Sequence, residues 1–533
     1  MNMAFKAVAY YLAGGKVMAK PKSLEATLWD ACNKLRGSVE PAEYKHVMLS
    51  LIFLKYANDR FDEQREKLVE NGKQAFLEML PFYQKDNVFF IPECARWAYL
   101  MKEAKQEDIA IKIDTALSEI EKKNPSLAGA LPDNYYSRLG LDSGVLSSLL
   151  DKMNGVNLRV EDDKDIFGRI YEYFLLHFAI QEGKNKGEYY TPKSVVALLC
   201  ELIEPYSGIV YDGACGSGGM FVQSAKFINE HKGNKKEISV YGQEYTATTL
   251  KLAKMNLAIR GISANLGQKA CSTFQKDQHK DLKADYALMN PPFNQRGWRE
   301  ENELLEDPRW DGYEIPPVGN ANYAWILNFI SKLSTNGTGC LLLANGALSS
   351  DEEYNIRKQI IKNDLVEAIL ILPSKMFYST DISVTVWVFN KNKSARTVVK
   401  NGKTISFRDR KDQVLFMDLR RKGHPFEKKY KELNEKDRSD ICEVFHNWQF
   451  DYEKYKNIKE FCYSATLKEI EKNDYSLVAS KYIELDVDKY QSNKDIETEL
   501  DEISSSLSAT YKSCDESIDS IKTLMKGLGH EIK

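Results

Sequence analysis

The sequence predicts an α/β protein: an N-terminal helical domain, a Rossmann-like domain with a mostly parallel seven-stranded sheet, and a C-terminal helical tail. Three observations predict this order. Residues 23–155 carry apolar residues at helical spacing. Short apolar runs then alternate with helical patterns, which is typical of a parallel sheet covered on both faces. Residues 490–530 return to helical spacing.

The chain has 533 residues, which is too long for one ordinary core, so we expect several domains. We divide it at 1–22, an extension expected to be disordered, 23–155, 156–425 and 426–533. Apolar residues make up 43% and charged residues 28%, as in soluble globular proteins. The apolar runs are too short for a membrane span, and no convincing signal peptide is present, so we expect a cytoplasmic protein.

Cysteine and charge content exclude some kinds of site. The nine cysteines form no CxxC pair and no zinc-like cluster with histidine, which favours reduced thiols and no metal. The formal net charge is −3. A protein with this balance that binds nucleic acid needs a local basic surface or a partner's charge.

Two segments predict the N-terminal helices. "SLEATLWDACNKLRG" (23–37) spaces Leu24, Leu28, Cys32 and Leu35 by three or four residues. "EYKHVMLSLIFLKYANDRFDEQREKL" (43–68) continues the helical pattern ahead of a charged face. We therefore expect a separate helical module.

The central region begins with two helices. "DIFGRIYEYFLLHFAI" (165–180) is the first. The second follows "GEYYTP": Thr191 is a good N-cap, Pro192 suits the first helical position, and Pro205 ends the pattern.

Strands and helices then alternate. We expect strands in "GIVYD", "ISVYGQEY", "ADYALMN", "GTGCLLLANGAL" and "VEAILILP", with helices at 219–231, 247–261, 322–333 and 352–363. "SVTVWVFNK" (383–391) follows its predecessor too closely for a crossover helix. We expect it to pair antiparallel at the sheet edge.

The tail carries a coiled-coil-like seam with one stutter. Its residues are Ile496, Leu500, Ile503, Leu507, Tyr511, Cys514, Ile518, Ile521 and Met525. The seam fits either packing on its own domain or binding a partner.

A glycine-rich loop follows the first strand. "VYDGACGSGGMF" passes from Asp212 through Gly216, Gly218 and Gly219 into a helix. Glycine lets a ligand approach the backbone, and a helix N-terminus is electropositive. The loop is not a phosphate-binding P-loop, because no Gly-Lys-Ser/Thr follows it, and it does not match the dinucleotide-binding G-x-G-x-x-G motif cleanly. It suits a ligand with an amino-acid end and a nucleoside end.

Glu244 ends the second strand, where an acid can accept hydrogen bonds from both ribose hydroxyls. Taken alone it would be a solvated strand-end residue. Behind the glycine-rich loop, the ribose role is the better interpretation.

"NPPF" (290–293) ends the third strand on the same edge. Neither proline has an N–H, so the Asn290 side chain and the Pro291 carbonyl are acceptors without a competing donor. Two acceptors can bind an NH₂ group and direct its lone pair toward an electrophile. Phe293 offers a face for a planar base, as enzymes that flip bases require. The alternative without a substrate role is a proline-rich loop at the edge of the sheet, with Phe293 packed in the hydrophobic core.

"DGACGSGG" followed by "NPPF" resembles the S-adenosylmethionine and catalytic motifs of DNA amino-methyltransferases. "LWDACNKLRGSVEPAEYKHVMLSLIFLKYANDRFDE", "GEYYTPKSVVALL" and "LPSKMFYSTDISVTVWVFNK" narrow this. Together they resemble the modification subunits (HsdM) of type I restriction–modification systems, which are adenine N6-specific DNA methyltransferases. The resemblance covers about residues 23 to 391, and more loosely "DYSLVASKYIE".

The resemblance implies S-adenosylmethionine as methyl donor, no metal, and a flipped adenine in double-stranded DNA as substrate. It implies that the adenine is held by Asn290, Pro291, Pro292 and Phe293. It implies that the cofactor is bound by Glu188, Tyr189, Tyr190, Thr191, Pro192, Lys193, Asp212, Ala214, Gly216, Ser217, Gly218, Gly219 and Glu244.

The chain departs from the family in two places. Gly213 stands where proline is usual, which should loosen the turn. The segment "QKACSTFQKD" (268–277) offers no clear match for a contact to the cofactor's adenine.

The family also implies partners in a bacterial or archaeal cytoplasm. A separate specificity subunit would read the target between two modification subunits, with a restriction and translocase subunit as a further partner. We expect the C-terminal seam to dock on the specificity subunit and the N-terminal module to clamp DNA.

Three alternatives stay open. A cytosine-N4 DNA methyltransferase would use a similar corner. A methyltransferase of a protein glutamine amide would too, although the N-terminal module and tail argue against it. A non-catalytic scaffold should have lost Asn290 or the loop glycines, and neither is lost.

Overall fold

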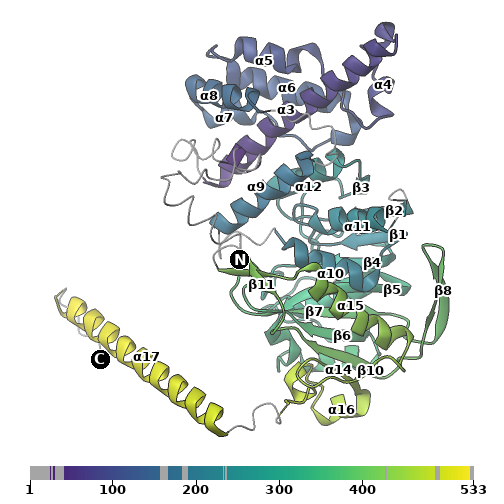
Figure 1. Ribbon diagram of the computed structural model, residues 1–533, viewed down its shortest axis with the longest axis vertical. Helices are drawn as coiled ribbons and strands as arrows, with labels where there is room; N and C mark the ends of the chain where they lie inside the picture. The colour runs from purple at the N-terminus through teal and green to yellow at the C-terminus, as the bar shows by residue number, and fades with distance from the viewer. Residues whose placement is uncertain are drawn as a thin grey trace, which may run out of the picture.

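The computed structural model describes residues 25, 28–29, 41–156, 166–182, 190–231, 233–234, 237–426, 429–486 and 493–527. The predicted extension 1–22 and most of the predicted helix over 23–37 lie outside these residues. Figure 1 shows helices at one end of the molecule, the sheet below them, and one long helix standing apart.

A helical unit precedes the sheet, as predicted. Its helices are α3 (Pro41–Glu70), α4 (Pro81–Gln84), α5 (Trp97–Glu103), α6 (Ile109–Lys123), α7 (Tyr135–Leu139) and α8 (Ser143–Asn154). In α3, every residue from Val47 to Leu54 is buried, because α5, α8 and α9 (Ile166–Glu182) pack around it. Asp142 is the N-cap of helix α8, and its carboxylate accepts from the Gly144 and Val145 amides.

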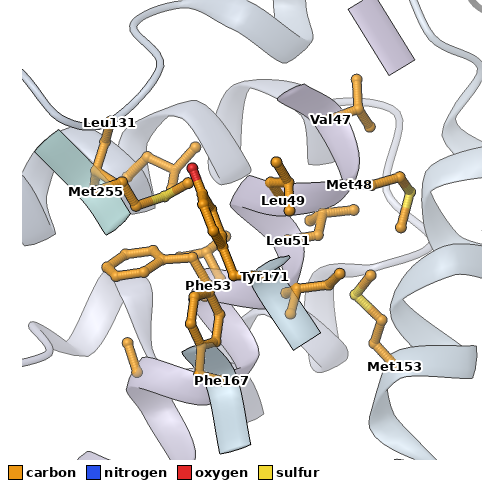
Figure 2. Packing of buried hydrophobic residues seen from close by; sticks show 14 of the residues in the cluster. Val47, Met48, Leu49, Leu51, Phe53, Leu131, Met153, Phe167, Tyr171 and Met255 are labelled. Carbon is orange, nitrogen blue, oxygen red and sulfur yellow. The ribbon is translucent and has the colours of Figure 1, made fainter. Parts of the chain in front are cut away.

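The helical unit shares its core with α12 (Ala247–Ile259). Leu252 and Met255 of α12 lie in the same buried cluster as the N-terminal helices, and Figure 2 shows Met255 beside Leu131. The Tyr171 hydroxyl of α9 donates to the Leu252 carbonyl at 2.9 Å, and Lys251 Nζ donates to the Leu131 carbonyl at 2.9 Å. Helix α12 is therefore fixed against the N-terminal unit.

The sheet contains nine strands among the described residues rather than the predicted seven, in the order β13-β10-β6-β7-β5-β4-β1-β2-β3. The strands are β1 (Gly208–Asp212), β2 (Ile238–Gly242), β3 (Ala264–Asn265), β4 (Ala284–Met289), β5 (Leu333–Ala344), β6 (Val366–Ile371), β7 (Val384–Asn390), β10 (Gln413–Asp418) and β13 (Cys462–Thr466). The strands β3, β10 and β13 are the ones that the sequence patterns did not mark. The sheet is mostly parallel, as expected.

Helices cover both faces of the sheet (Figure 1). They are α10 (Lys193–Ile203), α11 (Gly219–Glu230), α13 (Asn322–Lys332), α14 (Tyr354–Lys362), α15 (Glu435–Phe450) and α16 (Leu467–Lys472). The described helices give no candidate membrane span, since none combines the necessary length and apolar character.

The edge position predicted for 383–391 was wrong. Strand β7 is antiparallel, as expected, but it lies between β5 and β6 in the interior of the sheet. All seven of its residues are buried. The run "VTVWVFN" has apolar side chains on both faces, which is the pattern of a strand covered on both sides rather than of an edge strand.

The chain after residue 425, predicted to be a helical region, also forms strands. Strand β13 pairs with β10, and α15 packs on α10, where Arg438 Nε lies 2.9 Å from Glu201 Oε1. Two further antiparallel pairs lie outside the large sheet among the described residues: β8 (Arg396–Lys400) with β9 (Lys403–Phe407), and β11 (His424–Phe426) with β12 (Tyr430–Glu432). Helix α17 (Asn493–Gly527) contains the predicted seam and projects away from the sheet (Figure 1).

Candidate functional site

The three predicted loops meet at one edge of the sheet. Asp212 ends β1, Glu244 comes two residues after β2, and Asn290 follows β4 directly. In the sheet β1 lies between β4 and β2 and is parallel to both. The carboxyl ends of the three strands are therefore neighbours, which is where ligands bind in open α/β sheets.

The loop after β1 is held by polar contacts to its own backbone and to the loop after β2. Asp212 Oδ1 accepts from the Ala214 amide at 2.9 Å, and Glu244 Oε2 accepts from the Gly216 amide at 3.1 Å. Gly218 has a φ of +79° as the N-cap of α11, a conformation that favours glycine. The loop thus brings backbone amides and a helix N-terminus to the edge of the sheet.

Two carboxylates at this edge have a raised pKa: Asp212 is buried and Glu244 is half-buried. Burial, together with the nearby charge of Glu244, raises the pKa of Asp212 to about 8, while the Ala214 amide that donates to its carboxylate opposes the shift. Burial also raises the pKa of Glu244, while backbone amides that donate to its carboxylate oppose the shift. A cationic ligand would offset the cost of burying these charges.

One cavity collects most of the predicted cofactor residues. Tyr190, Thr191, Lys193, Asp212, Ala214, Gly216, Ser217, Gly219 and Asn290 line it, together with Glu172 and Asn256. Pro192 lines an adjacent cavity. Glu188 and Tyr189 lie outside the described residues. Lys193 Nζ forms an ion pair with Glu172 of α9.

The Thr191 hydroxyl does not cap a helix, contrary to the prediction. Helix α10 begins at Lys193, and Pro192 is its N-cap with an extended ψ of 135°. Asn290 Nδ2 instead donates to Thr191 Oγ1 at 2.9 Å. Asn290 Oδ1 is buried and has no hydrogen-bond partner among the described residues. A buried acceptor without a partner is costly unless a ligand supplies a donor.

The "NPPF" corner lines a second cavity, of about 200 Å³. Asn290, Pro291, Pro292 and Phe293 form one side of it, and residues of 379–384 form the other. The Phe293 ring lies edge-on to Phe377, with centroids 6.1 Å apart. Asn290 lies on the walls of both this cavity and the first one.

A third cavity, of about 500 Å³, contains residues that sequence reasoning missed. Glu244 and Asn290 line it together with Ser272, Thr273, Phe274 and Gln275. These four belong to the segment left without a role, because the preceding strand β3 spans only two residues and gives no pattern. Thr273 Oγ1 donates to the Gly213 carbonyl at 2.6 Å and fastens the turn where glycine replaces proline.

Asn256 is a second residue that was missed. It is buried on the otherwise apolar inner face of α12, and its Nδ2 donates to the Ser217 carbonyl at 2.8 Å. A buried amide in an apolar helical face was the available signal. Among the described residues, no group of three or more His, Cys, Asp or Glu side chains is arranged to hold a metal ion.

Two family models together match most of the chain. A model described as N-6 DNA Methylase matches residues 162–490, and one described as HsdM N-terminal domain matches residues 24–153.

Curated relatives agree with the family models. The HindI methylase subunit of a type I restriction enzyme from Haemophilus influenzae is 40% identical over 417 residues, covering 74% of this chain and 89% of the relative. The MjaIX methylase subunit of a type I restriction enzyme from Methanocaldococcus jannaschii is 32% identical over 526 residues, which cover 95% of this chain and 91% of the relative.

Solved structures share the fold. A type I methyltransferase subunit from Streptococcus thermophilus superposes with a TM-score of 0.70 at 20% identity, over 86% of this chain and 99% of that chain. A chain from a study of complex assembly in a type I R-M system superposes with a TM-score of 0.56 at 17% identity, over 94% of this chain and 99% of that chain.

Proposed function

Because the chain belongs to the N-6 DNA methylase family, as a methylase subunit of the type I restriction enzymes, we propose that it transfers a methyl group from S-adenosylmethionine to N6 of a flipped adenine in DNA. One observation carries the proposal: Asn290 Oδ1, which is buried and has no hydrogen-bond partner in the described part of the chain, lies where the three cavities meet. The N6 amine of an adenine can donate the hydrogen bond that this acceptor does not receive from the described residues.

The residues that line two of the cavities suit the two ends of the cofactor. We place the methionine end among Tyr190, Thr191 and Asp212, and the ribose at Glu244. The base then faces the wall formed by 272–275. The carboxylates of the buried Asp212 and the half-buried Glu244 suit the positive charge that the cofactor carries on its sulfonium and ammonium groups.

One side-chain oxygen and one backbone carbonyl of the corner hold the substrate amine. Asn290 Oδ1 and the Pro291 carbonyl accept the two N6 hydrogens, which directs the nitrogen lone pair toward the cofactor. When bound, S-adenosylmethionine supplies an activated methyl group, so the protein needs only to position the amine and exclude water. The same two acceptors stabilise the cationic nitrogen as it forms, before it loses a proton. Phe293 stacks on the adenine ring.

The chain acts, in this proposal, within a larger complex in the cytoplasm. Two copies flank one specificity subunit that reads the DNA target, and the seam of α17 docks on that subunit. The described seam residues Leu500, Ile503, Leu507, Tyr511 and Ile518 are exposed, with 42–65% of their surface accessible. The N-terminal helical unit closes around the DNA, and a restriction and translocase subunit completes the assembly.

Single-molecule sequencing of genomic DNA tests the activity directly. Cells with the wild-type chain should carry N6-methyladenine in a split motif, and cells with Asn290→Ala should lack it. Removal of a transition-state hydrogen-bond partner of this kind costs about 10²–10³ in rate. Modified cytosine in the motif would instead assign the chain to the N4 class. Identical adenine methylation in both strains would refute the role of Asn290.

A further inference from the structure

The side chain of Asn290 has two chemically different ends. Its Nδ2 donates to Thr191 Oγ1 at 2.9 Å, and its Oδ1 is the buried acceptor without a partner among the described residues. Rotation of the amide by 180° would exchange the two ends. It would then present an NH₂ group to the substrate amine, and two donors cannot bind each other. The activity therefore depends on which end of the amide faces the cavity.

We infer that Thr191 is a positioning residue for methyl transfer, which holds the Asn290 amide with Oδ1 facing the substrate amine. This inference rests on the function proposed above. The Thr191 oxygen accepts from Nδ2, so the orientation with Oδ1 inward satisfies both ends of the amide once substrate is bound. Without the hydroxyl, Nδ2 would be a buried donor with no acceptor in that orientation.

The backbone of both partners is restricted in the same way. Thr191 precedes Pro192, and Asn290 precedes Pro291. A residue before proline is confined largely to extended conformations, and the branched Cβ of threonine limits its χ1 rotamers. The hydroxyl and the amide are therefore presented to each other from two stiff segments, although they are 99 positions apart in the chain.

The position of Thr191 also links the amide to the cofactor cavity. Thr191 lines the same cavity as Asp212 and Ser217. Its hydroxyl has a single proton. A cofactor group that accepts this proton leaves only lone pairs of the oxygen facing Asn290, and these can bind Nδ2 but not Oδ1. Binding of the methyl donor would then reinforce the orientation that receives the amine.

Two substitutions of Thr191 distinguish the effect of its hydroxyl group from the effect of its branched side-chain shape. Thr191→Val keeps the branched shape and removes the hydroxyl, whereas Thr191→Ser keeps the hydroxyl. The rate is measured in a single turnover by the complex with its specificity subunit, on target DNA with saturating labelled S-adenosylmethionine. We expect Thr191→Val to slow methyl transfer about tenfold, the equivalent of one lost hydrogen bond. Thr191→Ser should stay within about threefold of wild type.

The dissociation constant of S-adenosylmethionine, measured by calorimetry, separates positioning from cofactor binding. Thr191→Val also removes a contact to the cofactor, so the constant itself can rise. Positioning predicts that the rate of Thr191→Val stays reduced when S-adenosylmethionine is saturating by this measured constant, whereas a loss of cofactor binding alone would be restored by saturation. Thr115→Val is the matched control, since Thr115 lies on the exposed surface of α6 and its hydroxyl donates to the Ile111 carbonyl. This control should leave both quantities unchanged.

A double substitution tests the orientation itself. In Asn290→Asp both ends of the side chain are oxygens, so rotation no longer matters. In that background, adding Thr191→Val should cost less than about threefold, against about tenfold beside Asn290. The same tenfold loss in both backgrounds would overturn the inference. So would an equal loss in Thr191→Val and Thr191→Ser. If the wild-type complex methylates no adenine, the proposed function fails before the variants are compared.

Discussion

Glu244 Oε2 accepts a hydrogen bond from the Gly216 amide at 3.1 Å, so the acid after β2 supports the glycine-rich loop after β1. The other oxygen, Oε1, accepts from the Thr246 amide at 2.8 Å, at the start of α12. One side chain thus ties two of the three site loops together and faces the largest of their cavities.

Glu244→Ala should weaken binding of S-adenosylmethionine about tenfold to a hundredfold, because hydrogen bonds to a charged group contribute roughly 1.5–3 kcal/mol each. Isothermal titration calorimetry of the purified chain measures this. Glu230→Ala, at the exposed end of α11, is the control and should bind as wild type does. Equal affinity in Glu244→Ala and wild type would remove Glu244 from the cofactor site.

Asp212 should make stability depend on pH. Burial raises the pKa of its folded-state carboxyl to about 8, from an ordinary value of 3.8. Between these values the folded chain holds a proton that the unfolded chain has released, so the free energy of unfolding falls as pH rises through this range. Asp212→Asn has no such proton. Its melting temperature relative to wild type should therefore rise steadily from pH 5 to pH 8.

Thermal unfolding at constant ionic strength measures this difference. Asp133→Asn, at an exposed position, serves as the control and should follow wild type at every pH. A constant offset between Asp212→Asn and wild type across the range would show that Asp212 does not titrate there.

Gly213 and Tyr211 should be energetically coupled. A Cβ at Gly213 would lie 2.6 Å from the Tyr211 hydroxyl oxygen and 3.1 Å from Met289 Cε. Gly213→Ala should destabilise the chain by about 1–3 kcal/mol through overpacking. Tyr211→Phe removes the obstructing oxygen, so the double variant should regain part of that loss. Denaturant unfolding of the four chains gives the coupling, and simple additivity would contradict the steric account.

The seam of α17 should be required for assembly but not for cofactor binding. Ile503→Glu with Leu507→Glu places two charges on the exposed apolar seam. Copurification with the specificity subunit should be lost, because burying an unpaired charge at an interface is costly. Ser505→Glu with Ser508→Glu adds the same charge elsewhere on the helix and should assemble normally. Loss of S-adenosylmethionine binding in the seam variant would indicate instead that α17 supports the catalytic fold.

Local pattern was sufficient to predict most elements and three strand-end loops. The apolar run of α3, the strand before Asp212 and the strand before "NPPF" each depend on neighbours in sequence, which is what periodicity reports. Parallel strands place their carboxyl ends on one edge, so the prediction that Asp212, Glu244 and Asn290 lie on the same edge followed from the strand pattern. That the three strands are neighbours is a fact of the sheet's order. The assigned roles of these residues stay predictions until they are tested.

Tertiary packing decided the rest. No local pattern could show that Thr191 bonds to Asn290 rather than capping α10, because the two residues are brought together only by the folding of separate segments. The same holds for the wall at 272–275 and for β7, whose interior place depends on which strands flank it. Contacts between distant segments are set by the burial of whole faces, and that burial exists only once the sheet and its helices have assembled.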